Sequence, residues 1–512
     1  MKRIFLLVLA AMLVCGSVKA QEPEHHYQFD YHQYLHMMTM VVQINIEGVE
    51  QQSANLELGS FNGSTVTGSE LLAEYSGGYW RAYFALYYNE EYTPSFKVYN
   101  HTTGEELSYC DLWFEGSPIT LTLVDGTGPG KKKNPLIIDF HHAYTQEIDA
   151  YGDPNTADTW YLVSTPVGGV SPAEVENMLN DNYDLYYFDQ AQDKEWVNYK
   201  SGVDPGFGLV AGKGYLYANS TGADITFVGA ANTDNVTVTL SKVAGADCEG
   251  WNLIGNPFAE EYEMNSGRLY YRMNGEGSDL TPGTGYVHPM EGVFVYAETD
   301  GETFTFTYPS GSKSESVAER VILDLSRGGK VIDRVMVNMG EGGTLPKFML
   351  DERHASVSIQ QGDKRYAVVN GEGAEVLAMN FKSDRMCEYV LTASVENAEV
   401  GYMHLIDRLT GADIDMLFTG SYTFVGTPDD MESRFIIRFA ESFDACPEVF
   451  AYQSGSDVIV SGEGTLQVYD VMGRFVNEYA INGVETLRDI PAGVYVFRIV
   501  GDHPRTQKIV VR

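Results

Sequence analysis

The chain is poor in basic residues, in cysteine and in long hydrophobic runs. It has 34 Lys and Arg against 71 Asp and Glu, which is a formal net charge of −37. Because nucleic acids and anionic membranes are bound through basic surfaces, this balance argues against both classes of partner. The five cysteines show no metal-type spacing, and 512 residues are enough to bury cores without a disulfide framework.

The only long apolar run lies at the N-terminus. After residue 20, no stretch approaches the roughly 18 apolar residues that a transmembrane helix needs. Residues 1–20 have the organisation of a secretory signal, with a basic start, an apolar run over residues 4–14 and small residues before the end. We expect cleavage between Ala20 and Gln21. The sequence therefore predicts an exported chain without a transmembrane segment.

Catalytic signatures are also missing. The chain contains no His-Glu-x-x-His, no Gly-x-Ser-x-Gly and no Cys-x-x-Cys motif. Residues 206–214 resemble a phosphate-binding loop only superficially, because the glycine spacing is wrong and Gly214 replaces the Ser or Thr that would bind Mg²⁺. We interpret this segment as a glycine-rich turn and predict no enzymatic activity. A glycosidase-type carboxylate pair stays open, since its geometry is not visible in a sequence.

Short strands of alternating polarity are what the chain does contain. Met38, Met40, Val42 and Ile44 follow a period of two, which places them on one face of a strand. Similar runs continue between turns rich in glycine and asparagine. The fold class predicted for the whole chain is all-β, with several antiparallel β-sandwich domains in tandem. The first covers residues 21–126, and a Gly-, Pro- and Lys-rich linker covers 127–144.

Residues 145–310 contain an internal duplication. Three segments recur in the same order: Trp160–Val167 as Trp251–Phe258, Leu185–Tyr187 as Leu269–Tyr271, and Gly214–Ala218 as Gly292–Ala297. These pairs define two copies of a β-unit, at about 159–232 and 250–310. A helix is expected only over 172–179, because Ser171 is suited to an N-cap and Pro172 to the first helical position. A third β-domain is expected over 311–440.

A loop at the start of the duplicated unit is the preferred candidate metal site. Asp149, Asp153, Asn155 and Asp158 present oxygen ligands at a spacing that suits a structural Ca²⁺. Ordinary turn chemistry of Asp and Asn is the alternative interpretation. No other cofactor is predicted.

The C-terminal segment, residues 447–512, carries the most specific motif. The residues that define it are Tyr469, Asp470, Gly473, Arg474, Gly493, Tyr495 and Lys508. This segment resembles the type A C-terminal sorting domain of the type IX secretion system. The resemblance implies an Ig-like domain, recognition by an outer-membrane translocon and its sortase-like peptidase, and a secreted or cell-surface location. The duplicated segments resemble modules of Bacteroidota surface proteins of unassigned activity.

These observations predict an exported, surface-anchored or secreted β-protein without enzymatic activity, adhesin-like or structural in role. A host protein or a glycan is the class of ligand expected. The alternative is a secreted carbohydrate-binding or carbohydrate-active protein, because 34 tyrosines and many carboxylates are suited to sugar recognition. Tyrosine is also a preferred strand residue, so its abundance alone does not select this alternative.

Overall fold

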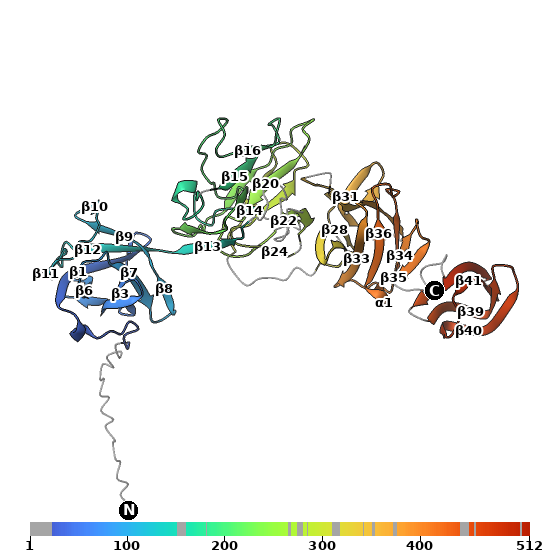
Figure 1. Cartoon of the computed structure of the whole chain (residues 1–512), viewed down its shortest axis with the longest axis horizontal. Coiled ribbons are helices and arrows are strands. Elements are labelled where there is room, and N and C mark those ends of the chain that lie inside the picture. The colour runs from blue at the N-terminus through green and yellow to red at the C-terminus, as the bar shows by residue number, and fades with distance from the viewer. Residues whose placement is uncertain are drawn as a thin grey trace, which may run out of the picture. The chain divides into compact units, whose positions relative to one another are not determined.

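The computed structural model confirms an all-β protein (Figure 1). Among the described residues, helix is limited to α1 (Met416–Thr419) and the 3-10 turns η1 (Tyr31–Gln33) and η2 (Pro172–Glu174). No described helix has the length and apolarity needed to cross a membrane. The described residues are 23–150, 160–180, 182–264, 268–273, 280–283, 285–309, 318–340, 342–350, 354–371, 376–440, 450–454, 457–501 and 504–511. They divide into two units, one ending at Ala143 and one beginning at Tyr144, apart from a short return of residues 228–230 to the first.

The first unit is a sandwich of two sheets. One follows the order β10-β9-β12-β1-β6-β5, with β2 and β11 also paired to β1, and the other follows β4-β3-β7-β8. The strands are β1 (His36–Ile46), β2 (Val49–Glu50), β3 (Leu56–Asn62), β4 (Thr65–Leu71), β5 (Ala73–Tyr75), β6 (Tyr79–Tyr88), β7 (Ser95–Asn100), β8 (Glu105–Leu107), β9 (Tyr109–Phe114), β10 (Ser117–Pro118), β11 (Gly126–Thr127) and β12 (Leu136–His141). The alternating residues Met38, Met40, Val42 and Ile44 are all buried, as predicted.

The segment predicted as a linker, residues 127–144, contains a central strand of this sandwich. β12 lies between β9 and β1 and runs parallel to β1, with Ile138 opposite Ile44. Leu136, Ile138 and Phe140 are fully buried in the same core as β1. These three residues lie at alternate positions, as on one face of a strand. The Gly, Pro and Lys residues before them favour a linker, but the prediction of a linker over this segment is wrong. The first unit therefore extends to residue 143 instead of 126.

The second unit begins with the predicted duplicated segment, which contains two sheets of the same strand order. The first copy has the sheet β14-β17-β15-β16 and the second has β20-β25-β22-β23. Each copy also has a two-stranded sheet, β13-β18 or β19-β26, and β21 pairs with β24. The bounds are β13 (Ala143–Ile148), β14 (Tyr161–Val163), β15 (Tyr183–Phe188), β16 (Trp196–Asn198), β17 (Tyr215–Asn219), β18 (Ala223–Val228), β19 (Val236–Thr239), β20 (Trp251–Gly255), β21 (Tyr262–Glu263), β22 (Tyr271–Met273), β23 (Leu280–Pro282), β24 (Tyr286–Val287), β25 (Gly292–Tyr296) and β26 (Thr303–Phe306).

Each copy begins one strand earlier than the sequence repeat indicated. The hydroxyl groups of Thr145 and Thr226 are 2.9 Å apart, and those of Thr237 and Thr305 are also 2.9 Å apart. The first pair links β13 to β18 and the second links β19 to β26, so the pairs are equivalent. The recurring sequence segments do not include β13 and β19, because these two strands have few large apolar residues in common.

The ladder also shifts one of the recurring segments by a residue. Leu216 pairs with Tyr186 in the first copy, and its counterpart Phe294 pairs with Tyr271 in the second. The recurring segments predict Tyr187 as the counterpart of Tyr271. The strand pairing shows that the counterpart is Tyr186. The shift matters because successive residues of a strand lie on opposite faces.

The two copies are joined by two equivalent backbone bridges. Val163 of β14 bridges Glu291, which directly precedes β25, and Ile254 of β20 bridges Lys213, which lies two residues before β17. In each copy, the first strand of the four-stranded sheet, β14 or β20, thus contacts the other copy at a single bridge, and the two contacts are related by a pseudo-two-fold arrangement. Gly255 lies at this contact, where a Cβ atom would come within 2.3 Å of the Ser164 Cβ and 2.7 Å of the Lys213 carbonyl oxygen. Only glycine allows the two sheets to approach this closely.

The predicted helix over 172–179 is a single 3-10 turn. Ser171 and Glu174 form the capping box that such a start favours. The turn does not continue, because the backbone of Glu176 exchanges two hydrogen bonds with Thr226 of β18. The backbone hydrogen bonds between Glu176 and β18 therefore replace those that a longer helix would make after the cap.

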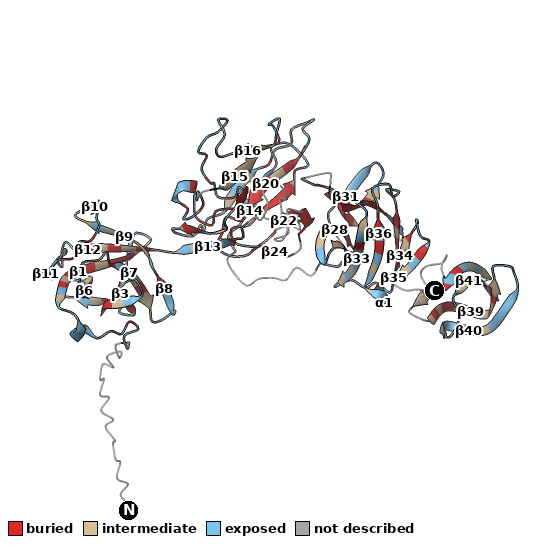
Figure 2. Ribbon diagram, viewed as in Figure 1, coloured by how far each residue is buried: buried red, intermediate tan, exposed pale blue. Residues whose placement is uncertain are grey.

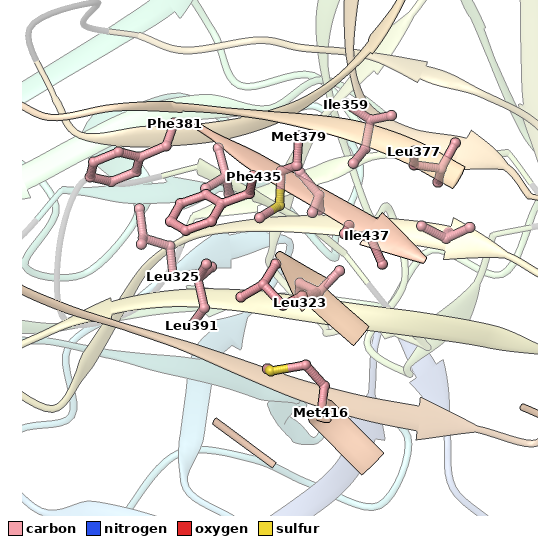
Figure 3. Packing of buried hydrophobic residues seen from close by; sticks show 14 of the residues in the cluster. Leu323, Leu325, Ile359, Leu377, Met379, Phe381, Leu391, Met416, Phe435 and Ile437 are labelled. Carbon is pink, nitrogen blue, oxygen red and sulfur yellow. The ribbon is translucent and has the colours of Figure 1, made fainter. Parts of the chain in front are cut away.

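The third β-domain is one sheet of eleven strands, ordered β35-β34-β37-β32-β30-β31-β28-β27-β33-β36 with β29 paired to β31. The strands are β27 (Arg320–Arg327), β28 (Lys330–Asn338), β29 (Leu345–Pro346), β30 (Ser356–Gln361), β31 (Lys364–Asn370), β32 (Val376–Lys382), β33 (Cys387–Glu396), β34 (Tyr402–Asp407), β35 (Ala412–Asp415), β36 (Ser421–Gly426) and β37 (Phe435–Ala440). Figure 3 shows Leu323, Leu325, Met379, Phe435 and other apolar side chains converging between its strands. The helix α1 carries the chain from β35 at one edge to β36 at the other, so the sheet curls toward a barrel.

A buried arginine links the two ends of this curled sheet. Arg434 is 1% exposed at its side chain and places Nε 3.1 Å and Nη2 2.8 Å from the two carboxylate oxygens of Asp407. It also donates to the Val425 carbonyl of the edge strand β36, and Tyr422 of β36 donates to Asp407. The guanidinium lies 4.5 Å from the ring centre of Phe424. A further bond from Nη1 to Asp430, at 2.6 Å, makes four hydrogen bonds from this cation to partners on both sides of the opening.

The duplicated unit and the third sheet share an apolar core. Trp251 stacks on Phe348, with ring centres 4.4 Å apart. The hydroxyl of Tyr271 donates to the Pro346 carbonyl and accepts the amide hydrogen of Phe348. Met336 of β28 is buried in the same cluster. The predicted boundary at residue 311 therefore separates two sheets that pack on one another.

The C-terminal residues 450–511 form a single curled antiparallel sheet of β38 (Ala451–Ser454), β39 (Asp457–Asp470), β40 (Phe475–Leu487), β41 (Gly493–Val500) and β42 (Arg505–Val511). β39 pairs with β40 along its length, while β38 and β41 share its other edge. The side chain of Gln507 bonds the backbone of Phe450 and Ala451 and so joins β42 to β38. Because these residues make one sheet, the predicted two-sheet Ig-like topology is not confirmed. Most residues of β40 are exposed, whereas β39 is mainly buried or intermediate (Figure 2).

We expect Gly255→Ala to lower the stability of the duplicated unit by about 1–3 kcal/mol, because an added methyl group overpacks the contact between the copies. Thermal unfolding followed by tryptophan fluorescence measures this, since Trp160, Trp196 and Trp251 lie in this unit. Gly202→Ala is the matched control, because no atom lies within 4 Å of its added Cβ. Equal unfolding midpoints for the two variants would contradict the packing described.

We expect Arg434→Met to destabilise the third domain by about 3–5 kcal/mol, because it leaves the Asp407 carboxylate buried and unpaired. Despite burial, hydrogen bonds from Arg434 hold the pKa of Asp407 below its ordinary value. The stabilisation is therefore present at pH 7 and is lost as the pH falls through the folded-state pKa. Scanning calorimetry at pH 7 and pH 3 measures both effects. Arg385→Met is the control, because the Arg385 side chain is exposed and its partner Asp384 keeps a second ion pair with Arg327.

Candidate functional site

The predicted metal loop and cleavage site fall largely outside the described residues. Asp153, Asn155 and Asp158 are outside them, as are Ala20 and Gln21. Asp149 is described, and its carboxylate accepts a hydrogen bond from the Tyr161 hydroxyl. In the described ranges, no group of three or more His, Cys, Asp or Glu side chains is placed to hold a metal ion. Structural Ca²⁺ at this loop stays a prediction.

The sorting-domain motif forms the turn between β39 and β40. Asp470 accepts hydrogen bonds from the amides of Met472 and Arg474, and the Arg474 Nε lies 2.7 Å from its second carboxylate oxygen. The backbone hydrogen bond from Arg474 is the main cause that lowers the pKa of Asp470. Gly473 has a φ of 79°, a conformation that favours glycine. The Asp-x-x-Gly-Arg sequence therefore encodes a self-contained turn.

The other motif residues lie beside this turn. Asp470 pairs with Tyr495 across β39 and β41, and Tyr469 pairs with Val496, which in turn pairs with Lys508 of β42. The Tyr495 hydroxyl donates to the Pro491 carbonyl at 2.9 Å, which anchors the start of β41. The structure thus brings the whole motif together at one end of the sheet.

A deeper concave site, which sequence reasoning missed, lies in the duplicated unit. We call it the aromatic groove, with a volume of about 860 Å³. Its lining includes Tyr187, Phe188, Asp189, Asp204, Phe207, Lys213, Gly214, Tyr215, Thr237, Val238, Thr239, Trp251 and Asn252. The glycine-rich segment over 206–214 forms one wall, held by the Tyr215 hydroxyl between the Val210 amide and the Gly208 carbonyl. This segment is a turn before a strand, as predicted, and has no phosphate-loop geometry.

The polar groups of the aromatic groove are partly engaged. Asp189 accepts hydrogen bonds from the Ala191 amide and the Gln192 side chain. Partial burial, with Asp204 and Asp189 nearby, raises the pKa of Tyr187 above its ordinary value. Tyr187 meets Phe207 edge to face at 5.0 Å between ring centres. The groove therefore combines half-exposed rings with carboxylates at its rim.

A second concavity, the charged groove, has a volume of about 480 Å³. It is lined by Gln146, Trp160, Tyr161, Leu162, Arg272, Met273, Thr281, His288, Pro289, Glu291, Gly292, Val331 and Arg334. Arg272 makes a two-point ion pair with Glu291, at 2.9 and 2.5 Å. Arg334 makes another with Asp324, at 2.6 and 3.0 Å.

The two grooves are equivalent under the pseudo-two-fold arrangement. Trp160 in one corresponds to Trp251 in the other, and Gly292 corresponds to Gly214. Each groove combines the first sheet strand of one copy with the residues before β17 or β25 of the other. Their chemistry has diverged, because Lys213 occupies the place of Glu291. The internal repeat is the sequence feature that could have indicated the two grooves. The sequence does not show the backbone bridges between the copies, which bring the lining residues together.

Deeply buried carboxylates occur away from both grooves and are engaged. Asp333 is bonded by both of its oxygens to the Lys347 Nζ at 2.5 Å, and burial raises its pKa. Asp407 is bound to Arg434, and Asp415 caps α1. In the described part of the chain, these side chains bind structural partners and do not form a pair across a groove.

Histidines near the N-terminus surround one further buried carboxylate. Glu57 accepts hydrogen bonds from the amides of His26 and Tyr27, at 2.7 and 3.0 Å, and from Ser69. The ring nitrogens of His25 and His101 lie 3.2 and 2.7 Å from its oxygens. These contacts fasten the segment before β1 to the sandwich.

Searches of family models, curated proteins and solved structures found no match to this chain.

We expect Glu57→Gln to speed hydrogen exchange at the His26 and Tyr27 amides by about tenfold or more, because a charged acceptor is worth roughly 1.5–3 kcal/mol. Hydrogen bonds outweigh burial and lower the pKa of Glu57. In the unsubstituted chain, protection is therefore kept above the unfolded pKa near 4.3 and lost as the pH falls through the folded value. Exchange followed by mass spectrometry tests this, with exposed Glu74→Gln as the control. Unchanged exchange would show that Glu57 does not fasten the segment.

Proposed function

We propose that this chain is an exported, non-enzymatic β-protein that acts as an adhesin-like binding protein at the cell surface. Its residues 447–512 serve as the type IX sorting domain, recognised by the translocon and its sortase-like peptidase. Its grooves in the duplicated unit bind a host protein or glycan. The net charge of −37 keeps such an exported chain soluble and directs it away from nucleic acid.

The observation that carries this proposal is the pair of equivalent grooves within one packed body. Both grooves belong to sheets that share the core around Trp251, Tyr271 and Phe348. Rigid concave sites with aromatic walls and a few polar groups are the usual form of binding sites. Two such sites in one body, each binding a different part of a ligand, raise the overall affinity through multivalency.

The sorting role is supported by the compactness of its motif. Asp470, Gly473 and Arg474 form a turn whose hydrogen bonds, among the described residues, are all made within residues 470–474. Such a local structure suits a signal that must be recognised on many unrelated proteins. Exposed Val471 and Met472 at the same turn provide apolar surface for a receptor.

A carbohydrate ligand is the second candidate. It is favoured by the half-exposed rings of Tyr187 and Phe188 beside Asp189 and Asp204 in the aromatic groove. Binding is preferred over hydrolysis because the described buried carboxylates are bonded to structural partners, as Asp333 is to Lys347.

We expect deletion of residues 447–512 to leave the protein in the periplasm of the producing bacterium, because the translocon then lacks its signal. Cell fractionation with immunoblotting measures the distribution. Asp470→Ala, which removes the acceptor of the turn, should reduce surface display, whereas Arg498→Ala at an exposed position of β41 should not. Normal surface display of the deleted form would refute the sorting assignment.

A further inference from the structure

The strand β19 presents a free edge to the aromatic groove. Leu240, which follows β19, donates its amide hydrogen to Glu302 and accepts that of Gly301. Because main-chain groups of a strand point alternately to its two sides, Val236 and Val238 also face β26. The amide and carbonyl groups of Thr237 and Thr239 therefore point away from β26. Among the described residues, no backbone partner is placed on that side.

The free edge of β19 borders the aromatic groove. Thr237, Val238 and Thr239 all line the cavity, although their side chains alternate between faces. Three consecutive lining residues indicate that the backbone edge itself borders the space. The segment 235–240 also lacks the lysine, proline or bulge that usually protects an exposed edge from pairing.

The lining of the same groove also contains aromatic rings that can contact a strand lying along this edge. Tyr187 and Phe207 form an edge-to-face pair, and Phe207 stacks on the buried ring of Tyr215. The groove volume of about 860 Å³ is near the upper end of the range for drug-sized ligands, so the groove has room for a few residues of an extended segment. Val236 and Val238 pack toward Gly212, which holds the glycine-rich wall against β19.

We propose that the aromatic groove binds an extended polypeptide segment of a partner protein, which adds as a strand to the free edge of β19. The main-chain groups of Thr237 and Thr239 supply hydrogen bonds, and alternate apolar side chains of the segment contact the wall at Tyr187 and Phe207. This mode needs no particular sequence for the hydrogen bonds and takes specificity from alternate side chains. It deepens the proposed function, on which it rests, by selecting a protein ligand over a glycan.

The test begins with a phage-displayed library of random linear dodecapeptides selected on the immobilised full chain. We expect enriched peptides with alternating apolar residues. The affinity of one synthesised peptide is then measured by fluorescence polarisation for the unsubstituted chain, Thr237→Pro and Thr305→Pro. Thr237→Pro removes an amide hydrogen from the groove edge and keeps the main-chain hydrogen bonds to β26. Both proline variants lose the hydroxyl contact between Thr237 and Thr305, so this loss is the same in the test and in the control. Thr305→Pro makes the same change on the far edge of β26, which does not line this groove.

We expect Thr237→Pro to weaken binding about tenfold or more and Thr305→Pro to leave it within about twofold, since each main-chain hydrogen bond is worth roughly 0.5–1.5 kcal/mol and several form together. A peptide N-methylated at alternate residues should lose affinity for the unsubstituted chain to a similar extent. This second measurement holds even if Thr237→Pro unfolds the site.

Three results would overturn the proposal: no enrichment of linear peptides, equal binding of the N-methylated peptide, or binding of array glycans that competes at this groove. Failure of the surface-display proposal would appear separately, as a wrong location in cell fractionation with peptide binding intact.

Discussion

The second unit depends on one apolar layer in which three sheets meet. Trp251 of the second copy contacts Tyr271 and Phe348, and Leu162 and Leu216 of the first copy belong to the same cluster. Neither copy could bury its Trp-bearing face alone, because each has only a four-stranded sheet of short strands. The duplication is therefore a condition of stability in this fold, since each copy covers the apolar face of the other. The third sheet covers what remains through Phe348 and Met336.

Close approach of the two copies has a steric requirement and a functional consequence. Gly255 removes a side chain where Ser164 and the Lys213 backbone converge, and Gly214 does the same beside Leu253. The same crossing contacts border the two grooves, so packing between the copies and the shape of the binding sites have a common origin. Once a groove was duplicated in this way, its charged positions were free to diverge, as Lys213 and Glu291 have done.

Buried charge in this protein serves to connect elements. Arg434 joins the edge strand β36 to Asp407 of β34, and Glu57 joins the segment before β1 to the sandwich. Each of these charges is surrounded by donors or acceptors that satisfy it, which is the condition under which burial is tolerated. A buried ion pair adds little to the free energy of unfolding compared with apolar residues of similar volume. Removing one partner lowers that free energy strongly, because the other charge stays buried without a partner. They determine which edges and segments lie together.

By itself, the sequence determined the all-β class, the inward face of β1, the duplication and the turn at Asp470–Arg474, because each depends on periodicity or on contacts within a few residues. It misplaced the helix at Pro172, the linker around β12 and the equivalence of Tyr271, because strand partners far along the chain override local signals. The grooves were decided only by the tertiary structure. Their walls combine Trp251 with Lys213, or Trp160 with Glu291, and the spacing of such residues along the chain contains no information about the bridges that bring them together.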